Sequence, residues 1–310
     1  MAFSVNTNSS ALAALQNLNQ TQTELASVQQ RINTGLKVSS AKDDSSAFVI
    51  AQNLRSDLSG MKSVTSSLNR AKSVLDVTLS GATQISDLMN QMRAKALEAS
   101  DAGLDTKSRA ALQLDFAALQ SNISTVIKSS DFNGTNLLDG NPTAPATPST
   151  LSALTSIKGS STLVVANLAI QGTVAAPGMM IQALTAAEAA GGAAITYDLL
   201  SSGVAPVGAV GANISTSNAA KDAITALDKA TVTMATNLNT LGSKARQVDS
   251  QLSFTAKLSD AITSGIGTLV DADLAAESAN LQALQLKQQL GVQALSIANQ
   301  SPQSISSLFR

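Results

Sequence analysis

The chain contains no cysteine, no histidine and no tryptophan, and its single tyrosine is Tyr197. It therefore lacks the thiol nucleophile, the usual soft metal ligands and the side chain that most often acts as a general base near neutral pH. Disulfides are also excluded, so cysteine usage indicates no particular redox compartment. This composition predicts no metal, no cofactor and no enzymatic activity.

An excess of charge of one sign is missing as well. The chain carries 20 basic and 21 acidic residues, without long blocks of like charge. A nucleic-acid-binding protein is expected to carry a basic stripe, so we predict no nucleic-acid partner. Aromatic residues make up only 2% of the chain, although 44% of it is hydrophobic. Small aliphatic side chains suit close helix–helix contact better than one thick globular core.

Long uninterrupted apolar runs are also absent, so no membrane insertion is predicted. Residues 1–10 show neither the basic nor the apolar region of a cleavable signal peptide. A cytosolic location and export by a route without a cleaved signal both remain open at this point.

Two long apolar heptad repeats dominate the chain. The first runs from Leu54 to Ala96, and the second runs from Leu227 to Leu269. A 3.5-residue repeat of this length indicates a helix whose apolar seam lies against other helices. With the interleaved apolar positions that begin at Ile50 and Ile224, each repeat covers about fifty residues. This gives a helix on the order of 70–80 Å long at 1.5 Å per residue. We therefore predict a mainly α fold, in which both ends of the chain form an elongated antiparallel helical hairpin or coiled-coil rod.

Capping residues and breaks delimit the predicted helices. Gly35 is a stop signal, and neighbouring carboxylates such as Asp43 and Asp44 fall at helix boundaries. We interpret these acids as caps rather than as catalytic or cation-binding pairs, because acids at helix starts complement the helix dipole. Three predicted helices cover about residues 11–32, 107–128 and 273–299. One long helix is capped by residues 43–46 and runs to about residue 100, and the other is capped by residues 215–218 and ends near residues 265–271.

The middle of the chain has a different character. Residues 141–212 hold five of the six prolines and only three charged residues. The short runs 163–165 and 195–197 are strand candidates between glycine and proline breaks. We predict a small β-containing module here.

The first and last predicted helices are apolar on more than one side. Leu12 and Leu15 form a second flank of the first helix, and a helix of this kind needs several partners. A core helix of a bundle is one interpretation, but no further helices of the chain are left to surround this pair. We therefore predict burial against other copies. The predicted self-assembly residues are Leu18, Leu25 and Ile32 in the first helix, Leu281, Leu284 and Leu295 on one side of the last helix, and Leu286, Leu290 and Ile297 on its other side.

Several motifs resemble those of bacterial flagellins. Residues 29–44 read QQRINTGLKVSSAKDD, which is similar to the N-terminal flagellin signature. Residues 271–275, 289–291, 298–303 and 307–310 resemble the flagellin C-terminus, and residues 132–134 read FNG where flagellins carry it. The resemblance covers residues 1–140 and 213–310 in collinear order. The short centre is similar to that of compact alphaproteobacterial flagellins.

The resemblance implies a structural subunit that polymerises into the flagellar filament for swimming motility. It assigns residues 1–40 and 272–310 to the inner filament core, residues 41–140 and 213–271 to the outer core, and residues 141–212 to a variable surface module. It also implies secretion to the extracellular filament without a cleaved signal peptide, through the flagellar type III export apparatus. The implied partners are other copies of the chain, an export chaperone, the filament cap and hook-associated proteins.

Flagellins detected by the vertebrate innate-immune flagellin receptor present an R-V-R-E-L type motif on the long helix. The corresponding residues here include Gln91, Arg93 and Lys95, of which only Arg93 keeps its match. The resemblance therefore implies weak or absent recognition.

Three alternatives were weighed against a filament subunit. A hook–filament junction protein shares the terminal-helix plan but does not polymerise indefinitely. A flagellin with a zinc protease in its centre is excluded, because an H-E-x-x-H site needs histidine. A self-standing coiled-coil adaptor would be a soluble, fully helical dimer.

Overall fold

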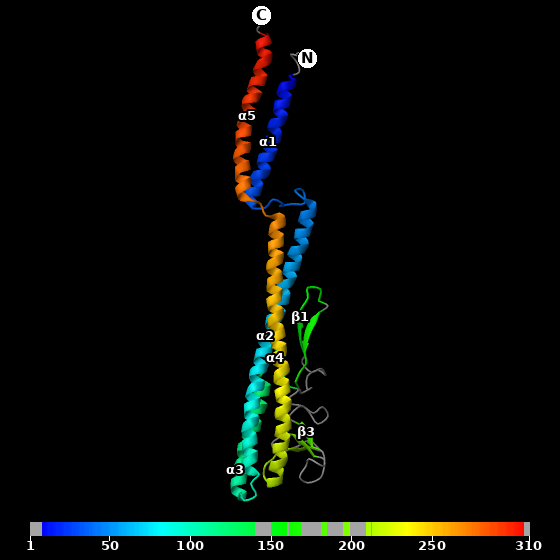
Figure 1. Cartoon of the computed structure of the whole chain (residues 1–310), viewed down its shortest axis with the longest axis vertical. Helices are drawn as coiled ribbons and strands as arrows, with labels where there is room; N and C mark the ends of the chain where they lie inside the picture. The colour runs from blue at the N-terminus through cyan, green and yellow to red at the C-terminus, as the bar shows by residue number, and fades with distance from the viewer. Residues whose placement is uncertain are drawn as a thin grey trace. The chain divides into compact units, whose positions relative to one another are not determined.

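The computed structural model describes residues 8–139, 150–159, 161–168, 181–184, 195–198, 209–211 and 213–306 (Figure 1). It forms two compact units, which we call the terminal unit (residues 1–59 with 258–310) and the central unit (residues 60–257). The described helices are α1 (Ser9–Thr34), α2 (Ser45–Ala99), α3 (Thr106–Ser129), α4 (Ser217–Val270) and α5 (Leu274–Ser306). The predicted mainly α fold is confirmed. None of these helices, over their described residues, is apolar enough for its length to cross a lipid bilayer.

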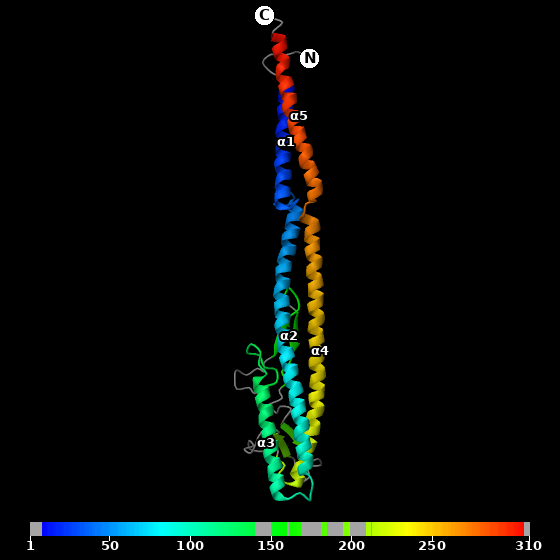
Figure 2. The ribbon, with the colours of Figure 1, turned by 90° about the vertical axis from the view of Figure 1, so that its left-hand side faces the viewer.

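In the central unit, α2 and α4 pack side by side in opposite directions (Figures 1 and 2). Their direction follows from two ion pairs, because Lys72 meets Asp249 whereas Arg93, later in α2, meets Asp228, earlier in α4. The predicted heptad seam is the core of this unit. Its buried positions are Met61, Leu68, Leu75, Ala82, Met89 and Ala96 in α2, and Leu227, Met234, Leu241, Val248 and Thr255 in α4.

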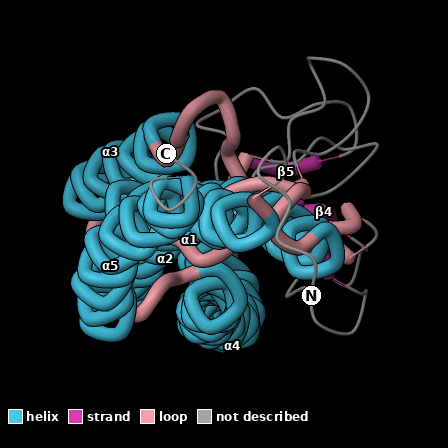
Figure 3. Tube along the Cα trace, turned by 90° about the horizontal axis from the view of Figure 1, so that it is seen from above, coloured by secondary structure: helices cyan, strands magenta, loops and turns pink. Residues whose placement is uncertain are grey.

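The helix α3 adds a third layer to this core through Phe116, Ile123 and Ile127, which are fully buried. Viewed from above, α3 and the strands β4 and β5 lie on different sides of the helices (Figure 3). A two-residue turn follows α3, in which Asn133 and Gly134 both have positive φ (53° and 76°). Phe132 and Thr135 exchange two backbone hydrogen bonds of 3.1 Å across this turn.

A β-hairpin packs on the long helices of the central unit. Its strands β1 (Leu151–Leu154) and β2 (Thr162–Val165) are antiparallel, with Leu151 opposite Val165. Alternate residues of both strands enter the helical core, as a half-buried sheet requires. The hairpin also explains Gly60 in α2, because a Cβ there would lie 2.5 Å from Ile157.

The remaining strands form a three-stranded sheet in the order β3 (Ile181–Leu184), β4 (Ile195–Asp198) and β5 (Ala209–Gly211). The pair β3–β4 is antiparallel, and β4–β5 is parallel. Both predicted strand candidates, 163–165 and 195–197, therefore lie in strands.

In the terminal unit, the connection between α1 and α2 is hydrogen-bonded to the connection between α4 and α5. Gly35 ends α1 in the left-handed conformation (φ 71°) and its carbonyl accepts from Ala272 N at 2.9 Å. Lys37 N in turn donates to the Val270 carbonyl at 2.8 Å. Val38 is buried in a small cluster with Ala51 and Val270. These contacts hold the residues that follow α1 against the residues that precede α5.

The cap predicted at Asp44 is present, whereas Asp43 Oδ2 accepts from the backbone N of Ser39 and Ser40 in the loop before α2. Asp44 Oδ1 accepts from the backbone N of Ser46 and Ala47, and Asp273 Oδ1 accepts from Ala275 N. Asp105 caps α3 in the same way and also accepts from the Ser108 hydroxyl, a hydrogen bond that lowers the pKa of Asp105. Carboxylates at helix starts thus satisfy free backbone N–H groups.

The end of the last helix differs from its prediction. The expected end near Asn299, before Pro302, is wrong, because α5 continues through Pro302 to Ser306. Proline removes the N–H that would bond to the Ala298 carbonyl four residues earlier. In the structure this carbonyl accepts instead from Asn8 Nδ2 at 2.7 Å, so it remains paired.

Candidate assembly surface

The terminal unit is built from α1 and α5, which pack antiparallel along most of their length (Figure 2). Thr21 and Val28 of α1 are buried. Six of the predicted self-assembly residues, which we call the seam residues of α1 and α5, are half-buried. They are Leu18, Leu25 and Ile32 in α1, and Leu281, Leu284 and Leu295 in α5.

Two ion pairs fix the register of this helix pair. Arg31 Nη1 lies 3.2 Å from Glu277 Oε1, and Lys287 Nζ lies 4.0 Å from Glu24 Oε2. The Glu277 side chain is only 12% exposed, so its partner matters more than that of a solvent-exposed carboxylate. Sequence reasoning missed these charges, although an antiparallel alignment of the two helices brings both pairs opposite each other.

The other side of α5 has no such cover. Leu286, Leu290 and Ile297 are 58%, 56% and 69% exposed. Leu12 and Leu15 of α1 are exposed as well. The two-sided pattern read from the sequence is thus resolved into one side that packs within the chain and another that faces outward. Contiguous exposed apolar side chains of this kind mark an interaction site.

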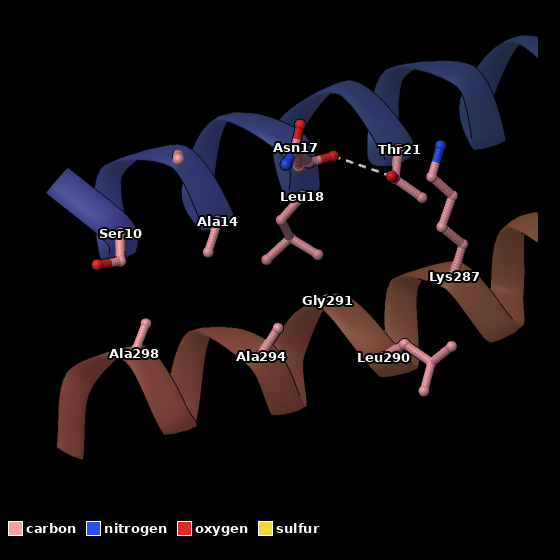
Figure 4. Close-up of a pocket in the computed structure, with 11 residues that line it drawn as sticks. Ser10, Ala14, Asn17, Leu18, Thr21, Lys287, Leu290, Gly291, Ala294 and Ala298 are labelled. Atoms are coloured by element: carbon pink, nitrogen blue, oxygen red, sulfur yellow. Dashed lines mark hydrogen bonds between the residues drawn. The ribbon is translucent and has the colours of Figure 1, made fainter. Parts of the chain in front are cut away.

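A groove with a volume of about 590 Å³ runs between α1 and α5 (Figure 4). Its α5 wall is formed largely by Gly291, Ala294 and Ala298, whose small side chains leave the space open. Leu18 points across the groove from α1 toward Gly291, and Lys287 points back toward α1 (Figure 4). The lining is apolar with few polar groups, which suits an aliphatic side chain better than a charged ligand.

The three residues compared with the receptor motif lie on α2 in the central unit. Gln91 is exposed, whereas Arg93 forms an ion pair with Asp228. Lys95 Nζ lies 3.0 Å from Asp115 Oδ2 on α3. The hydrogen bonds that Arg93 and Lys95 donate to these carboxylates raise the pKa of both cations.

A metal-binding site finds little support in the part of the chain that the structure describes. No group of three or more histidine, cysteine, aspartate or glutamate side chains there is arranged to hold a metal ion. Asp44, Asp105 and Asp273 act at helix starts, where they accept backbone hydrogen bonds, and Asp43 accepts from the loop before α2.

Comparison with known proteins identifies the family to which this architecture belongs. Residues 5–143 match the bacterial flagellin N-terminal helical region, and residues 224–309 match the bacterial flagellin C-terminal helical region. The chain is 43% identical to flagellin FljM of Caulobacter vibrioides over 99% of its length and 98% of that protein. The chain belongs to the bacterial flagellin family.

Two further relatives agree. Flagellin FljK of Caulobacter vibrioides is 41% identical over 99% of this chain and 98% of that protein, and the flagellin of Brucella melitensis is 34% identical over 99% of both. This flagellin is a structural subunit of the bacterial flagellar filament, an extracellular polymer of such chains. The hook–filament junction alternative is not supported.

Proposed function

We propose that this flagellin polymerises through the outward apolar sides of α1 and α5, which neighbouring subunits cover in the filament. The observation that carries this proposal is the exposure of Leu286, Leu290 and Ile297 on a helix whose opposite side is packed. Burying such side chains removes apolar surface from water and drives association. The seam residues of α1 and α5 then act indirectly, by holding the two helices together as one surface.

Leu290→Ala tests this directly. Truncation of a buried leucine costs about 2–5 kcal/mol. Since each 1.4 kcal/mol is a factor of ten, the critical concentration for polymerisation should rise roughly 30- to several-thousand-fold. Polymerisation and swimming should therefore be severely weakened, while thermal unfolding of the soluble subunit stays unchanged.

The matched control is Leu68→Ala, at a fully buried position of the central unit. This variant should lower the unfolding temperature of the subunit through the cavity it leaves. A Leu290→Ala protein that loses subunit stability yet polymerises normally would show that this side of α5 belongs to a subunit core, and the proposed assembly surface would be wrong.

The finer division of the filament follows the same proposal. Residues 1–40 and 272–310 form the inner core, residues 41–140 and 213–271 the outer core, and residues 141–212 the surface. The subunit leaves the cell unfolded through the type III apparatus with an export chaperone, without a cleaved signal peptide, and adds beneath the filament cap beyond the hook-associated proteins. A secretion assay in a strain lacking the export apparatus tests this route, since secretion in such a strain would contradict it.

Recognition by the vertebrate flagellin receptor is proposed to be weak. Two of the three compared positions, Gln91 and Lys95, differ from the motif, and Arg93 is already paired with Asp228. In a receptor reporter assay, the double variant Gln91→Arg with Lys95→Leu should signal more strongly than the wild type. A strong wild-type signal would contradict the proposal.

A further inference from the structure

One side chain joins the beginning of α1 to the end of α5. Asn8 is the N-cap of α1, and its Oδ1 accepts from Ala11 N at 3.1 Å. Its Nδ2 donates to the Ala298 carbonyl at 2.7 Å. A backbone N–H only donates and a carbonyl only accepts, so these two partners fix which way the side-chain amide points.

The Ala298 carbonyl is the group that Pro302 leaves without its helical donor. In an α-helix this carbonyl would accept from the N–H of residue 302, and proline has none. The helix nevertheless continues to Ser306. Ala298 is half-buried against α1, where an unpaired carbonyl is costly.

We propose that Asn8 is a positioning residue for filament assembly, whose amide replaces the N–H that Pro302 removes. This clasp, defined as Asn8, Ala298 and Pro302, caps α1 and at the same time secures α5 where proline interrupts its hydrogen bonds. The role in assembly rests on the proposed function of the α1–α5 surface, whereas the clasp itself does not.

The chemistry restricts position 8 to one residue type. Aspartate keeps the acceptor for Ala11 N but offers no donor to the carbonyl. Serine caps a helix well but is shorter than asparagine. Ala298 of the clasp also lines one end of the groove of Figure 4, together with Ser10. Losing the clasp should therefore loosen the groove walls near Ala298.

The test is a double-mutant cycle on the full chain, with Asn8→Asp, Pro302→Ala and both together. Asn8→Asp should raise the critical concentration of filaments on the order of tenfold, because a half-buried carbonyl loses its donor. In the Pro302→Ala background the alanine N–H supplies that donor. Asn8→Asp should therefore raise the critical concentration less than about threefold in this background. Equal effects in both backgrounds would overturn the clasp.

Asn19→Asp is the matched control, since it makes the same chemical change at an exposed position of α1. Its effect, whatever its size, should be the same with proline or alanine at position 302. A dependence on residue 302 equal to that of Asn8→Asp would mean that added charge explains the result, and would overturn the clasp.

A second readout separates the clasp from the proposed function. Hydrogen exchange of segment 299–306 is measured in the state, soluble subunit or filament, in which the wild type protects this segment. The exchange should accelerate several-fold in Asn8→Asp and should not accelerate in the double variant. If the wild type never polymerises, the proposed function fails while this cycle still decides the clasp. Full exchange of the segment in every state of the wild type would show that the bond does not form.

Discussion

Gly81 in the middle of α2 lies where two other elements approach the helix. A Cβ at this position would collide with the Ser130 hydroxyl and lie 3.0 Å from Leu138. Helix propensity alone favours alanine over glycine by about 1 kcal/mol. Here the absence of a side chain permits close packing, which explains why a long helix tolerates an interior glycine.

Gly81→Ala should therefore destabilise the central unit. Overpacking typically costs about 1–3 kcal/mol, which outweighs or cancels the gain in propensity. Gly242→Ala in α4 should instead stabilise by up to about 1 kcal/mol, because the nearest atom to its Cβ is the Arg246 guanidinium at 3.7 Å. Urea unfolding of both variants checks this, and equal shifts of the same sign would contradict it.

Asp105 gives the molecule a pH-sensitive cap. Hydrogen bonds from Ser108 and the Lys107 backbone hold the pKa of Asp105 below 3.8 in the folded chain. A lowered folded pKa contributes stability above the unfolded value and loses it as the pH falls through the folded value. Asp105→Asn keeps a capping side chain without this titration.

The wild type should therefore be more stable than Asp105→Asn at neutral pH, and the difference should shrink as the pH falls below 3.8. Thermal unfolding followed by circular dichroism at a series of pH values measures it. A difference that stays constant across this range would show that the carboxylate charge does not contribute.

At the scale of elements, α1 and α5 depend on each other and have their outer sides uncovered. We expect both helices to be largely unprotected from hydrogen exchange in the soluble subunit and strongly protected in filaments, because neighbours supply the missing apolar contacts. The buried stretch of α2, from Met61 to Ala96, provides the internal reference, since it should be protected in both states. Equal protection of α1 and α5 in the two states would contradict assembly-coupled ordering.

The sequence predicted elements where a repeat extended over many residues. The heptads of α2 and α4 were found in place, because a sustained apolar period leaves few other packings. The strands β1, β3 and β5 were missed, since runs of three or four residues carry little periodic signal. The passage of α5 through Pro302 was missed because it depends on Asn8, whose approach is set by the register between two helices distant in sequence.

At the scale of the whole molecule, the proposed assembly surface and the compositionally distinct segment are made of different residues. The predicted surface module, residues 141–212, lies outside the α1–α5 pair and outside both regions matched to flagellins, apart from residues 141–143. Its hairpin, however, buries Leu151, Leu163 and Val165 in the core of the central unit. The module therefore contributes to subunit stability without belonging to the proposed assembly surface.

Replacing residues 141–212 with a short Gly/Ser linker should consequently leave polymerisation intact and lower the stability of the central unit. Each buried leucine or valine contributes roughly 1.5–3 kcal/mol, so the unfolding temperature should fall clearly. A second variant that keeps residues 150–168 and replaces only 169–208 retains the hairpin and should recover most of that stability. Electron microscopy and thermal unfolding of both variants provide the two readouts. If both are exported and folded yet neither forms filaments, the module takes part in assembly, and contacts beyond α1 and α5 must hold the subunits together.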